Sequence, residues 1–303
     1  MPFAVRAPDQ KSRPESRERA GDVVSELARG YAARMNDCGF AHALRERRIS
    51  REQWISFISA LYPAVVGFNR ALILSIAKVD HVRNSVFLGA LAEQLKEEQA
   101  HNQLWREKLK RFGIDHEKLY SDLESYRARF TAAELDAMTA KTLAAVTDDL
   151  SRGDEGNFPD AIVPDAVLAL CHLLGTSATN ENVGYWEHFA SQAGIEMVIW
   201  GVVSATVLPG VLGNPELDIG PVTTQWLREH GQIAGAKSEA RTDEEKHLDL
   251  SRIALNRSEE ANADVTVVGA RAENAMRLFA ASFICQEQAV ARFPLGRYRE
   301  RAA

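Results

Sequence analysis

Cysteine is scarce in this sequence, and the few cysteines are poorly placed for cross-linking. Only three of 303 residues are cysteines, and no two of them form a Cys-x-x-Cys pair: Cys38, Cys171 and Cys285. An odd number of widely separated cysteines argues against a disulfide framework and against a zinc site made of thiolates. We therefore expect a reduced, cytoplasmic environment.

Concentrated positive charge and long apolar runs are also missing. The formal net charge is -6, and the basic residues are scattered, whereas phosphate binding needs a basic face. The apolar stretch 197–213, "MVIWGVVSATVLPGVLG", is short for a membrane span and is interrupted by Gly201, Pro209 and Gly210. We expect no nucleic-acid partner and no membrane partner, and a buried core helix at 197–213.

Strand alternation is nearly absent, so the sequence predicts an all-α protein. Apolar residues recur at three- and four-residue intervals from Arg51, where Ser50 is placed to cap a helix, and Gly113 is placed to end a second one. We expect a flexible tail at 1–20 and one helical-bundle domain at 21–303, with a helical insertion around 114–160. The expected helices lie at 51–79, 83–111, 164–175, 181–208, 221–234, from 243 onward, and at 266–292.

Two Glu-x-x-His units are the most informative motifs. Glu98 precedes His101 by three residues, and Glu244 precedes His247 in the same way, with Asp243 beside it. Side chains three apart on a helix share a face, so each pair can reach one point in space. Carboxylates and neutral imidazoles suit iron or manganese, and two such helices facing each other typically form a dinuclear carboxylate site. The competing interpretation is a solvated charge run on each helix.

A dinuclear site usually takes a further carboxylate from a third helix. The candidates are Glu181, Glu187 and Glu196, of which we favour Glu196 because it directly precedes an apolar run. An unpaired carboxylate buried there would be costly, which favours a ligand role. Alternatively, Glu196 is a surface acid at a helix start, where the helix dipole stabilises it.

The order of three segments supports a family resemblance. "LYPAVVGFNRAL", then "LKEEQAHNQLWREKLKRFGI", then "DEEKHLDLSRIAL" resembles the haem-oxygenase-like diiron oxidases and oxygenases, best over 51–113 and more loosely over 181–250. The resemblance implies a haem-oxygenase-like multi-helix bundle that holds Fe(II), two ions if the site is complete. It also implies that dioxygen oxidises a small molecule by N-oxygenation, desaturation or oxidative carbon–carbon cleavage of an amine or amino acid.

By this resemblance Glu98 and His101 are the first ligand pair, and His247 with Asp243 or Glu244 is the late pair. The sequence departs from the family pattern where the late helix has Ala240 in place of a histidine. It departs again where Ala205 and Thr206, rather than a glutamate, precede Pro209. His230 could replace the missing histidine if the segment after it folds back. The number of metal ions, two, one or none, stays open.

Two other functions remain open. A metal-free enzyme of the same fold would resemble thiaminase-like or quinone-synthase relatives and use the acids and histidines as acid/base groups. A non-catalytic interaction protein would expose both Glu-x-x-His units to a partner. Arg106 and Lys110 could pair with a substrate carboxylate, although a solvated helix face accounts for them more simply. The choice between a monomer and a homodimer is also open.

Overall fold

The computed structural model confirms the all-α class. It describes residues 19–79, 85–146, 165–231, 243–258, 263–285, 293 and 295–300, with the backbone alone at 85–87, 90, 243–244 and 246–247. Apart from one isolated bridge between Ile114 and Arg299, the described regular elements are helices. They are α1 (Ala20–Asn36), α2 (Gly39–Arg45), α3 (Arg51–Lys78), α4 (Ser85–Arg111), α5 (His116–Arg127), α6 (Ala132–Ala145), α7 (Asp165–Thr179), α8 (Tyr185–Val202), the π-helix η2 (Val203–Val207), α9 (Leu208–Val211), α10 (Pro221–Glu229), α11 (Asp243–Asn256), α12 (Val265–Ile284) and the 3₁₀-helix η4 (Leu295–Tyr298).

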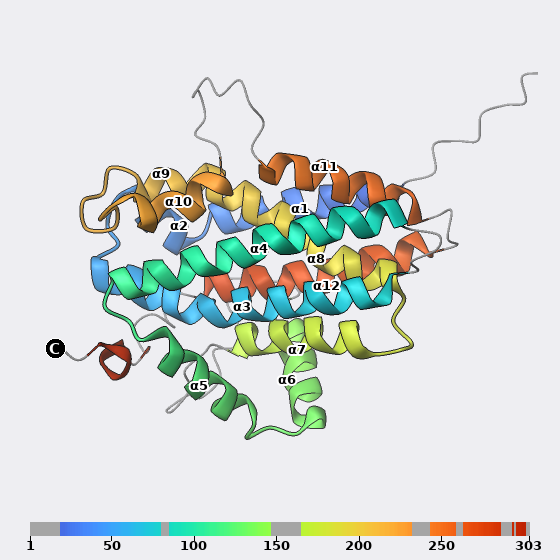
Figure 1. The fold of residues 1–303 in the computed structure, drawn as a ribbon, viewed down its shortest axis with the longest axis horizontal. Coiled ribbons are helices and arrows are strands. Elements are labelled where there is room, and N and C mark those ends of the chain that lie inside the picture. Colours follow the sequence, from blue (N-terminus) through green and yellow to red (C-terminus); the bar gives the residue numbers. More distant parts are fainter. Residues whose placement is uncertain are drawn as a thin grey trace, which may run out of the picture.

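The long helices run lengthwise beside one another and form a bundle (Figure 1). Helix α12 packs against α8, α1 and α7, while α3 packs against α7 and α4. Helix α11 packs against α1 and α8, and the short α10 packs against α4 near one end of the bundle. Helices α5 and α6 fall within the predicted insertion and pack near α3 and α7. Helices α4, α8 and α10 all contribute side chains to one interior cavity.

The predicted start of α3 and the predicted stop after α4 both occur. The hydroxyl of Ser50 accepts a hydrogen bond from the backbone N–H of Gln53 at 3.2 Å, and the Gln53 side chain accepts from the Ser50 N–H at 2.9 Å. Such a capping box satisfies two N–H groups that the helix itself leaves open. Gly113 has a φ of +73°, a left-handed conformation that glycine adopts without steric cost and that ends α4.

Other expectations need correction or lie beyond the described residues. Helices α1 and α2 precede residue 51, where the sequence analysis named no helix, and α10 ends at Glu229, short of the expected 234. The predicted tail up to residue 18, the segment 147–164 and residues 286–292 lie outside the described part of the chain.

By length and composition alone, two helical stretches are apolar enough to cross a membrane. They are α3 and the continuous Tyr185–Val211 helix, so the expectation that no segment is long enough was too strict. In both, 67% of the apolar window is buried inside the protein. That burial agrees with the core helix expected at 197–213.

Candidate metal centre

Four side chains of α4 line up along one face of the helix. Glu98, His101, Trp105 and Lys108 follow one another at intervals of three, four and three residues, which keeps them on one side of the helix. Glu98 is 7% exposed, Trp105 4% and Lys108 0%, and the side chain of His101 is largely buried. Helix α10 packs against α4 and brings further polar groups to this face.

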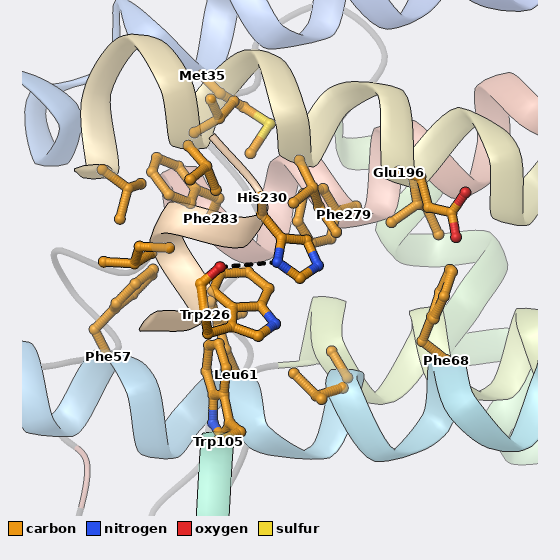
Figure 2. A pocket seen from close by; sticks show the side chains of 18 of the residues that line it. Met35, Phe57, Leu61, Phe68, Trp105, Glu196, Trp226, His230, Phe279 and Phe283 are labelled. Atoms are coloured by element: carbon orange, nitrogen blue, oxygen red, sulfur yellow. Dashed lines mark hydrogen bonds between the residues drawn. The ribbon is translucent and has the colours of Figure 1, made fainter. Parts of the chain in front are cut away.

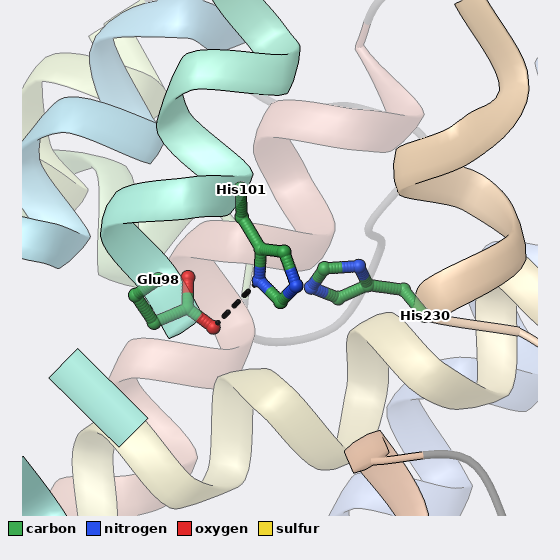
Figure 3. A group of neighbouring side chains, drawn as sticks. All are labelled: Glu98, His101 and His230. Atoms are coloured by element: carbon green, nitrogen blue, oxygen red, sulfur yellow. Dashed lines mark hydrogen bonds and ion pairs between the residues drawn. The ribbon is translucent and has the colours of Figure 1, made fainter. Parts of the chain in front are cut away.

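Glu98, His101 and His230 converge on one point (Figure 3). Each offers one ligand atom, and the three atoms lie within 4.8 Å of one another. His101 Nδ1 is 3.2 Å from Glu98 Oε1, and the His101 and His230 ring centroids are 4.2 Å apart. The Glu-x-x-His unit on α4 thus meets a histidine at the end of α10, as the sequence analysis considered for His230.

A backbone hydrogen bond fixes the orientation of His230. Its Nδ1 lies 2.9 Å from the carbonyl oxygen of Trp226, one helical turn earlier. Because a carbonyl can only accept, Nδ1 carries the proton, and the lone pair of neutral His230 is on Nε2. The Trp226 ring stacks on the imidazole at 4.0 Å between centroids. Metal-binding histidines are commonly held in this way, with the second ring nitrogen donating to a carbonyl.

Carboxylates surround His101 on both sides. Burial alone lowers the pKa of His101, but the hydrogen bond to Glu98 and the charges of Glu98, Glu229 and Glu97 outweigh it, and the net pKa is raised. Glu229 Oε2 lies 3.4 Å from His101 Nε2. Glu229 belongs to none of the motifs recognised in the sequence, although it directly precedes His230.

The three converging residues fit a metal ion by donor chemistry and by burial. Two imidazoles and one carboxylate, without a thiolate, form the ligand set typical of non-haem Fe(II) oxygenases. The side chains of Glu98 and His101 are only 9% and 12% exposed, so this unit is no solvated charge run. It also lacks the exposure that a non-catalytic docking surface would need.

Glu196, the favoured third-helix carboxylate, lies on the wall of the same cavity as Glu98 and His230 but outside the converging group (Figure 2). It is 5% exposed and accepts a hydrogen bond from the Gln94 amide. The alternatives have other surroundings, since Glu187 pairs with Arg271 at 3.5 Å and Glu181 is exposed.

The structure describes α11 at Asp243, Glu244 and His247 by its backbone alone, and Ala240 lies outside the described residues. Their metal roles stay predictions. Thr206, which stands near the position of the family's middle glutamate, is fully buried and donates to Asn36 at 2.7 Å. Its hydroxyl also accepts from Arg45, so Thr206 joins η2 to α1 and α2.

A largely apolar cavity of about 100 Å³ adjoins the converging residues (Figure 2). This volume is several times what one water molecule requires. Its wall comes from α1, α3, α4, α7, α8, η2, α10 and α12. Among the described residues, the titratable groups on that wall are Glu98, Lys108, Glu196 and His230.

Comparisons with known proteins support the fold and no more. No protein-family model matches the sequence. No curated protein has a significantly similar sequence. Among solved structures, a TenA homologue from Pseudomonas syringae pv. tomato superposes with a TM-score of 0.56 at 11% identity, covering 95% of this chain and 99% of that one. The chain therefore has the all-α class that the sequence pattern predicted and the haem-oxygenase-like fold that the resemblance implied.

Proposed function

We propose that the chain is a non-haem iron oxidase or oxygenase that uses dioxygen to oxidise a small molecule held in the adjoining cavity. The observation that carries this proposal is the convergence of Glu98, His101 and His230 within 4.8 Å. Bound Fe(II) would supply redox chemistry with dioxygen and would leave coordination positions open in such a ligand set. The proposal includes membership of the chain in the haem-oxygenase-like metal oxidases.

The side chains around the group have separable tasks. Glu98 and His101 are set at helical spacing on α4, and the Trp226 carbonyl holds His230 with Nε2 free of a proton. The apolar wall excludes water from the space in which a substrate would lie, which strengthens electrostatic interactions there. N-oxygenation, desaturation and carbon–carbon cleavage of an amine or amino acid are the candidate reactions, as the resemblance implies.

The three converging residues suffice for one ion. A second ion would draw on Glu196 and on Asp243, Glu244 and His247 of α11, as the sequence analysis expected. Iron stoichiometry separates the two arrangements. One ion per chain supports the three-residue site, whereas two ions per chain, with one lost in His247→Ala, support the dinuclear site.

A metal-free enzyme is the second candidate, and one observation favours it. His101 lies between two carboxylates, at 3.2 Å from Glu98 and 3.4 Å from Glu229, an arrangement that suits proton transfer to or from a bound substrate. Such an enzyme would turn over its substrate without iron and would retain no stoichiometric metal.

The test is iron binding by protein purified anaerobically and loaded with Fe(II), followed by dioxygen consumption. We expect the wild type to retain stoichiometric iron, and His101→Ala and His230→Ala to lose affinity by about a hundredfold or more, since even outer ligand contacts are worth ten- to a hundredfold. His42→Ala is the matched control, because His42 also pairs with a carboxylate, Asp37 at 3.2 Å, but at the surface.

Iron retention in the wild type and in His42→Ala, with loss in the two site variants, supports the proposal. Equal iron retention in all four proteins contradicts the assignment of ligands. Absence of retained iron in the wild type contradicts the proposal itself and leaves the metal-free enzyme.

A further inference from the structure

Lys108 is a fully buried lysine on the cavity wall. It is 0% exposed, and its Nζ has no hydrogen-bond partner among the described residues. The amine lies 4.6 Å from the centroid of the Trp105 ring and 5.2 Å from that of Trp226, both of which also line the cavity. Cation–π contacts with two indoles favour the charged form, but they do not replace a counterion.

Among the described residues, neither carboxylate on the cavity wall serves as that counterion. Glu98 lies about 15 Å away along the axis of α4, by the helical rise, and it contacts His101. Glu196 accepts a hydrogen bond from Gln94. Burial is the cause that lowers the pKa of Lys108 to about 7, so the amine is close to half protonated at neutral pH.

An isolated buried amine of this kind costs stability, and an anionic ligand would remove the cost by pairing with it. The rest of the wall suits the remainder of such a ligand, because it is made almost entirely of aliphatic and aromatic side chains, among them Leu61, Phe68 and Phe279 (Figure 2).

We propose that this cavity binds an apolar carboxylate, with the carboxylate paired to Lys108 and the hydrocarbon part extending toward Glu98, Glu196 and His230. The helical rise separates Lys108 from His101 by about 10 Å along α4, a length that a medium-length alkyl or aryl-alkyl chain spans. As a substrate class for the oxygenase this inference rests on the proposed function, and among its candidate reactions an apolar carboxylate without an amine group leaves desaturation and carbon–carbon cleavage. Carboxylate binding itself does not require iron.

Binding of a carboxylate to Lys108 should change the number of protons that the protein holds. Above pH 7 the free protein holds a mostly neutral Lys108, and the bound ligand stabilises the ammonium, so binding must take up a proton. The other titratable groups on the wall are Glu98 on α4, Glu196 on α8 and His230 after α10, and the α3, α7 and α12 lining is apolar. Because the pKa of Lys108 is about 7 in the free protein, the affinity for octanoate should fall about tenfold for each pH unit above 7.

The experiment is isothermal titration of metal-free protein with octanoate and with its uncharged isostere octanamide. At pH 6.5 we expect octanoate to bind about tenfold to a hundredfold more tightly, as for a hydrogen bond to a charged group. At pH 8.5, titration in two buffers of different ionisation heat should show uptake of about one proton per octanoate and none per octanamide.

Two variants make the result specific to Lys108. In Lys108→Met the preference for octanoate and the proton uptake should disappear while octanamide still binds, which shows an intact cavity. Lys110→Met, at an exposed position on the same helix, should behave as the wild type. Equal binding of octanoate and octanamide by the wild type, no binding of either, or an unchanged preference in Lys108→Met would overturn the proposal. Because iron is absent, none of these outcomes depends on the metal test above.

Discussion

Replacing Lys108 with methionine should stabilise the folded chain at neutral pH, and the gain should shrink as the pH rises. The pKa of this amine is about 7 in the folded chain and 10.5 as its ordinary value. Between these values the unfolded chain binds a proton that the folded chain lacks. Raising the pH removes that proton from the unfolded chain, so the wild type gains stability with pH, whereas the methionine variant has no such titration.

The size of the effect follows from the two pKa values. At about 1.4 kcal/mol for each tenfold difference in proton affinity, protonation of the unfolded chain costs the wild type roughly 4 kcal/mol at pH 7. By pH 9.5 the same cost falls to roughly 1 kcal/mol. The stability gap between the methionine variant and the wild type should therefore close by about 3 kcal/mol over this range.

Urea unfolding of both proteins at several pH values between 7 and 9.5 measures this gap. Other titrating groups are common to the two proteins and cancel in the difference. Coincident transitions by far-UV circular dichroism and tryptophan fluorescence justify the two-state treatment. A gap that does not change with pH would refute the reasoning, since it would mean that Lys108 keeps its proton in the folded chain or has access to water.

Two further predictions concern stability. Burial lowers the pKa of His188 to about 4, so between pH 6.5 and 4 the unfolded chain gains a proton that the folded chain does not bind. The stability that the wild type has above pH 6.5 should therefore fall by about 3 kcal/mol on acidification to pH 4. Acid unfolding curves of His188→Asn should lack this pH dependence. In α1, a Cβ at Gly21 would lie 2.3 Å from the Arg252 carbonyl oxygen, whereas one at Gly30 meets nothing within 4 Å. Calorimetry should therefore show Gly21→Ala destabilised by about 1–3 kcal/mol and Gly30→Ala stabilised by about 0.5–1 kcal/mol; a higher melting temperature for Gly21→Ala would contradict this packing.

Local rules account for the parts of the fold that the sequence predicted. Ser50 and Gly113 act within one helical turn of their own positions, so their capping roles are visible without knowledge of tertiary structure. The contact between Glu98 and His101 is equally local, because helical spacing alone brings the two side chains together.

The remainder of the site depends on packing that spacing does not encode. His230 and Glu229 reach His101 only because α10 docks on α4. From the sequence, His230 could be named only as one possible replacement for the histidine that the late helix lacks. Lys108 is a different case. Continuing the stripe of Glu98 and His101 by helical periodicity leads to it, whereas Arg106 and Lys110, the bases that the sequence analysis considered, are exposed.

Helix α10 carries a consequence for how the site would assemble. It spans nine residues, too few for a helix to be stable alone in water, and it rests on α4 and α9. Local opening of α10 would withdraw His230 while Glu98 and His101 stay together on the 27-residue α4. An ion that binds all three ligands would then stabilise the docked position of α10. By thermodynamic linkage, the free energy by which the ion stabilises docking equals the free energy by which docking of α10 strengthens ion binding. Amide hydrogen exchange in α10 should slow when metal is added, and it should do so more than exchange in α4.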